Sequence, residues 1–137
     1  MEENNTNINQ YKILFLDDDR FILDMYSTKF ASTKHEVRFA SSADEAERIL
    51  KDGFKPDAIV FDLIMPGKQG FDFVSDIKKE HWDEGAVLIA LTNQNEYEDY
   101  ERAENLHLDE YIVKANHIPS EVIAIIENTI KNKKSPK

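Results

Sequence analysis

Short, nearly continuous apolar runs alternate along the chain with longer stretches in which apolar residues recur every three or four positions. Short runs bounded by polar residues are typical of strands in a parallel sheet, whereas the longer periodic stretches predict amphipathic helices. The predicted strands are 12–16, 36–40, 57–61, 86–91 and 110–113. The predicted helices are 20–32, 42–52, 70–80, 95–105 and a last helix that begins near Pro119.

Strand and helix alternate five times, and this order predicts one α/β domain over residues 11–132. Strands that follow one another through helical connections form a parallel sheet with right-handed crossovers, so helices should cover both of its faces. Local signals support the second helix, because Ser42 and Glu45 predict a capping box at its start and Gly53 predicts a C-cap at its end.

Composition limits the classes of function that this chain can serve. The sequence has 137 residues and no cysteine, so it fits one domain without disulfides or thiol chemistry. No run approaches the roughly 20 apolar residues of a membrane span, and no leader peptide is evident, which predicts a cytoplasmic protein without membrane contact. The formal net charge of −10 disfavours nucleic-acid binding. Residues 1–10 and 133–137 are expected to be flexible tails, and the histidines lack the spacing of a zinc site.

Polar residues with distinctive chemistry follow four of the apolar runs. In chain order they are Asp17-Asp18-Asp19, Asp62, Thr92 and Lys114. The carboxyl ends of parallel strands meet at one edge of the sheet, where open α/β folds form ligand sites, so these groups should lie together. Clustered carboxylates without sulfur ligands favour a hard ion, most simply Mg²⁺. Asp19 is better placed as the N-cap of the first helix than as a ligand.

The same residues, in the same order, resemble the CheY-like receiver domain of two-component response regulators. The resemblance covers nearly the whole chain and rests on Asp17-Asp18, on Asp62 within the motif 61–67, and on Thr92, Tyr111 and Lys114. It implies a doubly wound, flavodoxin-like (βα)5 sandwich with a five-stranded parallel sheet of order 2-1-3-4-5.

By this resemblance the chain is a phospho-acceptor in a two-component or phosphorelay system. A sensor histidine kinase or a histidine phosphotransfer protein would donate a phosphoryl group to Asp62, and Lys114 would pair with Asp62 or a phosphoryl oxygen. Asp18, Asp62 and the backbone carbonyl of Ile64 would hold Mg²⁺, or Mn²⁺ in its place. Asp17 would act mostly through bound water. The domain would catalyse only its own phosphorylation and dephosphorylation.

The resemblance also implies a switch. Once the acyl phosphate forms, the Thr92 hydroxyl would turn to a phosphoryl oxygen and Tyr111 would follow it inward. This would reshape the face made by the fourth helix, the fifth strand and the fifth helix, where an unidentified downstream protein, or a second copy in a phosphorylation-dependent dimer, would bind. Tyr97, Tyr100 and Ile123 are candidates for this face, although each also fits ordinary packing. No output domain is expected after the fifth helix.

Three positions depart from the family pattern. Ala115 stands where family members carry proline, and the cost of a cis bond before alanine, about 2.5–4 kcal/mol, predicts a trans Lys114–Ala115 bond. Asn93 replaces a small residue and is expected to crowd the mouth of the site. His107 replaces a glycine in the loop before the fifth strand; if that position keeps φ > 0, histidine tolerates it better than most residues but at some strain.

Two further residues line the mouth of the site in this family, and here they are Ile64 and Gln94. An apolar Ile64 cannot orient an attacking water, whereas Gln94 can. We therefore expect a phosphoryl group on Asp62 to be moderately long-lived.

Two other functions stay open on the sequence alone. One is a phosphorylation-independent interaction module that keeps the fold; the intact site argues against it, and the departures at Asn93 and Ala115 leave it open. A phosphatase of the haloacid dehalogenase type would use Asp17 as nucleophile and Asp19 as acid. The next residues, Arg20-Phe21, fit that motif poorly, and there is no cap insertion. The residue that becomes phosphorylated separates these cases.

Overall fold

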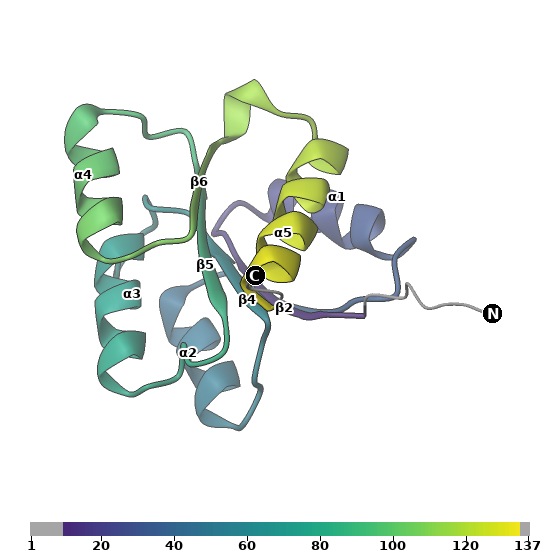
Figure 1. Ribbon diagram of the computed structural model, residues 1–137, viewed down its shortest axis with the longest axis horizontal. Coiled ribbons are helices and arrows are strands. Elements are labelled where there is room, and N and C mark those ends of the chain that lie inside the picture. The colour runs from purple at the N-terminus through teal and green to yellow at the C-terminus, as the bar shows by residue number, and fades with distance from the viewer. Residues whose placement is uncertain (1–9, 135–137) are drawn as a thin grey trace.

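A five-stranded parallel sheet forms the centre of the computed structural model, which describes residues 10–134 (Figure 1). The strands are β2 (Lys12–Leu16), β3 (Glu36–Ala40), β4 (Ala58–Phe61), β5 (Val87–Thr92) and β6 (Glu110–Val113). Their spatial order is β3-β2-β4-β5-β6, and every neighbouring pair is parallel. Counted along the chain this is the order 2-1-3-4-5, so the predicted doubly wound α/β fold is confirmed.

Helices cover both faces of the sheet, with α1 and α5 on one side and α2, α3 and α4 on the other (Figure 1). The helical elements are α1 (Arg20–Phe30), α2 (Ala43–Lys51), α3 (Gly70–Lys79), α4 (Tyr97–Asn105), the 3-10 turn η1 (Lys114–Asn116) and α5 (Pro119–Lys134). Successive strand residues feed opposite apolar clusters, as in Leu14 under α2 and α3 and Phe15 under α1 and α5. Between residues 10 and 134 no helix is long and apolar enough to cross a membrane.

Polar side chains fix where the first two helices begin. Asp19 Oδ1 accepts the N–H of Phe21 at 2.9 Å, so Asp19 is the N-cap of α1, as predicted. Ser42 caps α2 by accepting the N–H of Glu45 at 3.1 Å. The predicted capping box is incomplete, because the Glu45 carboxylate accepts the N–H of Ser41 rather than that of Ser42.

The C-terminal end of the fold differs from the prediction. Helix α5 continues through Lys134, so residues 133 and 134 are helical rather than part of a tail. Lysines in the last turn interact favourably with the helix dipole, and here Lys133 Nζ lies 3.7 Å from Asp109 Oδ1 and Lys134 Nζ 3.0 Å from Asp57 Oδ1. The turn η1 was not predicted, because three residues are too few to leave a periodic signal. The rest of the predicted tails, 1–9 and 135–137, lies outside the described residues.

Candidate functional site

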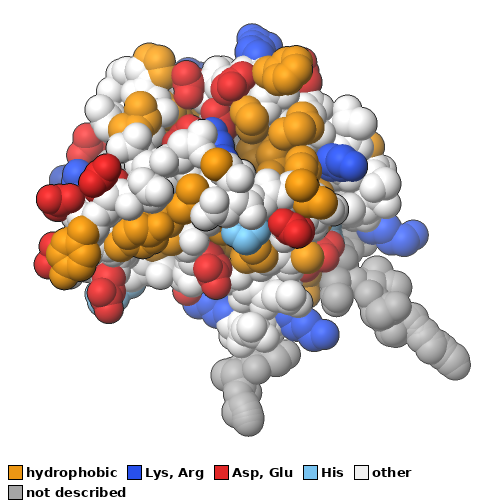
Figure 2. Space-filling model, turned by 90° about the horizontal axis from the view of Figure 1, so that it is seen from above, with side chains coloured by type: hydrophobic (Ala, Val, Ile, Leu, Met, Phe, Trp, Pro, Cys, Tyr) orange, Lys and Arg blue, Asp and Glu red, His pale blue; other side chains and the backbone are white. Residues whose placement is uncertain are grey.

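The predicted site residues meet at the edge of the sheet where the strands end. Asp17 and Asp18 follow β2, Asp62 follows the adjacent β4, and Lys114 follows β6. Figure 2 looks down on this edge, where acidic and basic side chains lie among hydrophobic ones. Residues far apart in the sequence therefore converge here because parallel strands present their carboxyl ends together.

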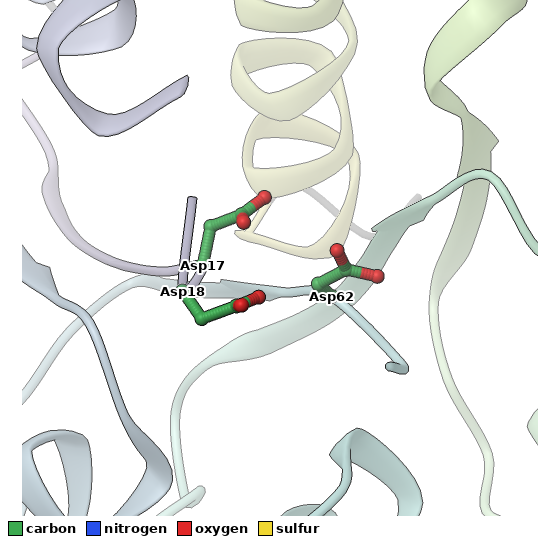
Figure 3. A group of neighbouring side chains, drawn as sticks. All are labelled: Asp17, Asp18 and Asp62. Atoms are coloured by element: carbon green, nitrogen blue, oxygen red, sulfur yellow. The ribbon is translucent and has the colours of Figure 1, made fainter. Parts of the chain in front are cut away.

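Three aspartates, Asp17, Asp18 and Asp62, form an acidic cluster (Figure 3). One carboxylate oxygen of each lies within 4.8 Å of the others. Asp17 is 1% exposed and Asp62 is 8% exposed, whereas Asp18 faces solvent. Carboxylates this close together repel one another, most strongly where they are buried, so the cluster attracts cations.

Lys114 is the cation that reaches the acidic cluster. Its Nζ lies 2.7 Å from Asp17 Oδ2 and 2.9 Å from Asp62 Oδ2. The contact with Asp62 agrees with the predicted pairing. The contact with Asp17 was missed, because the sequence does not reveal which of two adjacent aspartates turns toward the lysine. Lys114 thus ties the end of β6 to the ends of β2 and β4.

The electrostatics of this pair follow from burial. Burial raises the pKa of Asp17 above its ordinary value, and the contact with Lys114 offsets only part of that effect. Burial also acts to lower the pKa of Lys114, but its polar contacts with the Asp17 and Asp62 carboxylates outweigh it, so the net pKa is raised. Lys114 is therefore held as a cation.

The acidic cluster fits a hard divalent cation. Asp17 Oδ2 is buried and accepts no well-directed hydrogen bond from the described residues, although Lys114 Nζ is at ion-pair distance. Three carboxylates facing one ammonium leave a net negative charge. Donors that are all carboxylate oxygens suit Mg²⁺ or Mn²⁺ better than soft metals. Asp17, Asp18 and Asp62 are the residues that could hold such an ion.

The loop after Asp62 folds back tightly against it. The N–H of Ile64 donates to Asp62 Oδ1 at 3.3 Å, and the N–H of Gly70 donates to the Leu63 carbonyl at 2.9 Å. A Cβ on Gly70 would collide with the Asp62 carbonyl oxygen and would lie 2.7 Å from the Leu63 Cα. Only glycine fits this approach. From the sequence Gly70 was predicted only as the start of a helix, and its contact with the Asp62 peptide was not predicted.

A lysine anchors the same loop to two helices. Lys68 Nζ lies 2.8 Å from Glu47 Oε2 on α2 and also pairs with Asp76 on α3. Hydrogen bonds to Asp76 and then to Glu47 raise the pKa of Lys68. This cluster was not predicted, because no sequence motif connects three residues on three separate segments.

On the other side of the site, the backbone of Gln94 engages both predicted switch residues. The N–H of Gln94 donates to Thr92 Oγ1 at 3.3 Å, and the Tyr111 hydroxyl donates to the Gln94 carbonyl at 2.5 Å. The Tyr111 ring packs on Tyr100 of α4, with centroids 4.3 Å apart. Burial raises the pKa of Tyr111, which keeps its hydroxyl a donor. Thr92 and Tyr111 are therefore linked through Gln94.

The departures from the family pattern have distinct outcomes. The Lys114–Ala115 bond is trans, as predicted, and the position of His107 does keep a positive φ, of 61°. Asn93 is exposed, and its Oδ1 accepts the N–H of Ala115 at 3.1 Å. The side chain expected to crowd the mouth of the site is thus directed to the neighbouring turn. His81, with a φ of 62°, is a second positive-φ residue that was not predicted.

Two of the three candidates for an interaction face are exposed. Tyr97 and Tyr100 present aromatic rings on α4. Ile123 is buried in the core between α5 and the sheet, so its ordinary-packing interpretation is the correct one.

Comparison with known proteins agrees with the family resemblance of the sequence. The profile of the family described as "Response regulator receiver domain" matches residues 13–127. The response regulator SaeR of Staphylococcus aureus (strain USA300) is 30% identical over 122 residues, which is 89% of this chain and 51% of that protein. The chain therefore spans about half the length of the curated relatives that it matches.

Solved structures show the same fold. A CheY-like response regulator receiver domain protein from Methanospirillum hungatei superposes with a TM-score of 0.79 at 24% identity, covering 92% of this chain and 98% of that chain. A response regulator receiver domain protein from Clostridium thermocellum gives a TM-score of 0.77 at 29% identity, covering 90% and 96%.

Proposed function

The chain belongs to the response regulator receiver domain family, and we propose that Asp62 is its phosphoryl acceptor. The observation that carries the proposal is the contact of Lys114 Nζ with Asp62 Oδ2 at 2.9 Å, beside the acidic cluster. A carboxylate attacks a phosphoryl group more readily when positive charge close to both groups offsets their combined negative charge. Of the three clustered carboxylates, Asp62 is the one that lies in the motif 61–67 and also contacts Lys114.

The donor in this proposal is a phosphohistidine on a sensor histidine kinase or a histidine phosphotransfer protein. A carboxylate oxygen of Asp62 attacks phosphorus, and the P–O bond forms as the P–N bond to histidine breaks. The histidine nitrogen keeps the electron pair, and Asp62 becomes an acyl phosphate. Lys114 offsets the negative charge on the transferring group, and positioning supplies most of the rate.

Asp18, Asp62 and the Ile64 backbone carbonyl would hold Mg²⁺, or Mn²⁺ in its place, with Asp17 acting through water. The ion, when bound, supplies charge neutralisation to the phosphoryl oxygens. The all-oxygen cluster, and the net negative charge that remains beside Lys114, support this assignment. Because the ion would bind only the folded state, millimolar Mg²⁺ should raise the melting temperature. An unchanged melting temperature would contradict the assignment.

Apolar side chains around the site support a protein as the donor. Phe21 is 80% exposed, Ile64 is 50% exposed and Ile118 is 60% exposed. Phe21 is in α1, which follows Asp18; Ile64 is in the loop after Asp62; and Ile118 lies between η1 and α5, after Lys114. Figure 2 shows hydrophobic side chains on this face of the molecule. Exposed apolar groups around a polar centre are typical of a protein-binding site.

Thr92 and Tyr111 would carry the signal away from Asp62. The Thr92 hydroxyl oxygen now accepts the Gln94 N–H, so turning toward a phosphoryl oxygen breaks this bond. Gln94 then moves, and Tyr111 loses its carbonyl partner. The face of α4, β6 and α5 would change, and a downstream protein or a second copy would bind it.

Intact mass tests the proposal directly. Wild type and Asp62→Asn are incubated with Mg²⁺ and acetyl phosphate. Gain of one phosphoryl group by wild type alone is the expected result. Labelling of both proteins, with loss of label in Asp17→Asn, would identify the phosphatase mechanism instead. Absence of label in folded wild type would favour a phosphorylation-independent module.

A further inference from the structure

We propose that Asn93 is a positioning residue that holds Lys114 in place for phosphoryl transfer, an inference that rests on the proposed function. Asn93 directly follows Thr92, the last residue of β5. Its Oδ1 accepts the N–H of Ala115, the residue after Lys114, at 3.1 Å. One side chain therefore joins the loop at the phosphoryl site to the turn that carries the lysine.

The bond lies where the pairing of two strands ends. Thr92 and Val113 are the last paired positions of β5 and β6. Asn93 and Lys114 come next, and both strands stop there. The Asn93 side chain supplies a cross-link between the two segments one step beyond the ladder. The side-chain bond therefore restrains the backbone next to Lys114, where the pairing of β5 and β6 has ended.

The turn after Lys114 has little else to define it. η1 is one 3-10 turn of three residues, and the N–H of His117 donates to the Lys114 carbonyl at 3.3 Å. Single 3-10 turns have poorer hydrogen-bond geometry than α-helix. Ala115 has no ring to fix φ, as proline would have. The bond from Asn93 supplies a restraint that the alanine lacks.

The departures from the family pattern at Asn93 and Ala115 depend on each other. A proline at 115 would have no N–H, so an acceptor at 93 would have nothing to bind there. A small residue at 93 would leave the Ala115 N–H to water. With both present, the bond restrains the backbone of Lys114, whose Nζ lies 2.9 Å from Asp62 Oδ2. Small displacements of a catalytic cation cost rate steeply.

The test compares Asn93→Ala with Asn95→Ala. Asn95 is an exposed asparagine two residues along the loop, with no side-chain hydrogen bond recorded within residues 10–134. Asn93→Ala should slow phosphorylation by acetyl phosphate at saturating Mg²⁺ by about threefold to tenfold, the range expected for one lost hydrogen bond. Its Ala115 amide should exchange with solvent faster. Asn95→Ala should change neither quantity.

A conservative variant separates the bond from the residue. Asn93→Asp keeps the acceptor oxygen, so Ala115 should stay protected. At high salt, which screens the added charge, its rate should exceed that of Asn93→Ala. Equal loss of rate in both variants would overturn the inference.

The Mg²⁺ dependence separates positioning from general loosening. In Asn93→Ala the half-saturating Mg²⁺ concentration should not rise, because the assigned ligands follow β2 and β4. A rise, with a lower melting temperature, would indicate a structural role and contradict the inference. An unchanged phosphorylation rate in Asn93→Ala, with an Ala115 amide that has lost its protection from exchange, would also contradict the inference. Wild type that gains no phosphoryl group would instead contradict the proposed function itself, and the inference would fall with it.

Discussion

The two halves of the site are built differently. The acidic half, which we define as Asp17, Asp18 and Asp62, follows β2 and β4. Backbone contacts fix it there: the N–H of Asp17 donates to the Ala40 carbonyl at 3.1 Å, and Gly70 packs on the Asp62 peptide. The β5–β6 half, which we define as Thr92–Gln94 with Tyr111, is held by hydrogen bonds that involve single side chains.

This difference separates binding from switching. A cation site needs donors whose positions do not change, and backbone packing against a glycine provides that. A switch needs contacts that can be broken one at a time, and a hydroxyl bonded to one peptide provides that. Lys114 joins the halves, since it follows β6 and contacts Asp17 and Asp62. Substitutions in each half should therefore have different consequences.

The largest effect should come from cutting the link between the halves. Lys114→Met leaves the Asp17 and Asp62 carboxylates buried beside each other without their cation, at a cost of about 3 kcal/mol in the free energy of unfolding without metal. Urea denaturation in EDTA measures this loss. Mg²⁺ should restore more stability to this variant than to wild type, because the lysine no longer competes.

Lys55→Met is the matched control for that variant. Lys55 is exposed, and no ion pair is recorded for it in the part of the chain from 10 to 134. Its free energy of unfolding should stay within about 0.5 kcal/mol of wild type. Equal losses in the two lysine variants would show that Lys114 does not stabilise the acidic cluster.

Gly70→Ala should disturb the acidic half alone. The added methyl group collides with the Asp62 peptide, so the free energy of unfolding should fall by about 1–3 kcal/mol. The Mg²⁺-induced rise in melting temperature should shrink with it. Gly85→Ala has open space around its Cβ and should lose stability only through its positive φ, leaving the Mg²⁺ effect intact.

Ile64→Asn should shorten the life of the acyl phosphate severalfold, because an amide can orient the attacking water that isoleucine cannot. Loss of label from phosphorylated protein after removal of acetyl phosphate measures the half-life. Ile118→Asn, at another exposed isoleucine near the site, is the control and should leave the half-life unchanged. An unchanged half-life in Ile64→Asn would contradict this account of the mouth of the site.

Tyr111→Phe should test the β5–β6 half with a smaller change. Losing the hydrogen bond to the Gln94 carbonyl should cost about 1 kcal/mol. Phosphorylation of Asp62 should continue, since the hydroxyl does not touch the acidic cluster. Tyr100→Phe keeps the aromatic stack and is the control. Loss of phosphorylation in Tyr111→Phe would mean that the halves are not separable.

The smallest effect is a pH dependence in the acidic half. Because the pKa of Asp17 is raised in the folded state, its contribution to stability is complete below the ordinary value of 3.8 and is lost as pH rises through the raised pKa. Asp17→Asn cannot ionise. In EDTA its stability relative to wild type should therefore increase as pH rises from about 3.8 toward neutrality. A difference that does not vary with pH would contradict the burial argument.

The sequence predicts the acidic half better than the β5–β6 half. Asp17, Asp18 and Asp62 each follow an apolar run, and the parallel-sheet rule alone brings their segments to one edge. The same rule places Lys114 there. Thr92 is also placed, but nothing in the sequence shows that Gln94 engages it.

Contacts between loops escaped the prediction for a physical reason. Asn93 was expected to crowd the site, yet it binds Ala115, because a side chain at a strand end has several partners within reach. Local propensity fixes none of them. The same holds for Lys68, whose partners lie on α2 and α3. Ile123 fits both a core and a surface pattern on α5, and only packing decides that it is buried.

Amide spectra of the ¹⁵N-labelled protein test the division of the site most directly. Spectra are recorded without metal, with Mg²⁺, and with Mg²⁺ and acetyl phosphate. Mg²⁺ alone should shift the amides of Asp18 and Asp62 and leave those of Gln94 and Tyr111 in place. Phosphorylation should then shift Gln94 and Tyr111. Equal shifts of Gln94 and Tyr111 with Mg²⁺ alone, or no shift on phosphorylation, would contradict a fixed binding half and a separate switching half.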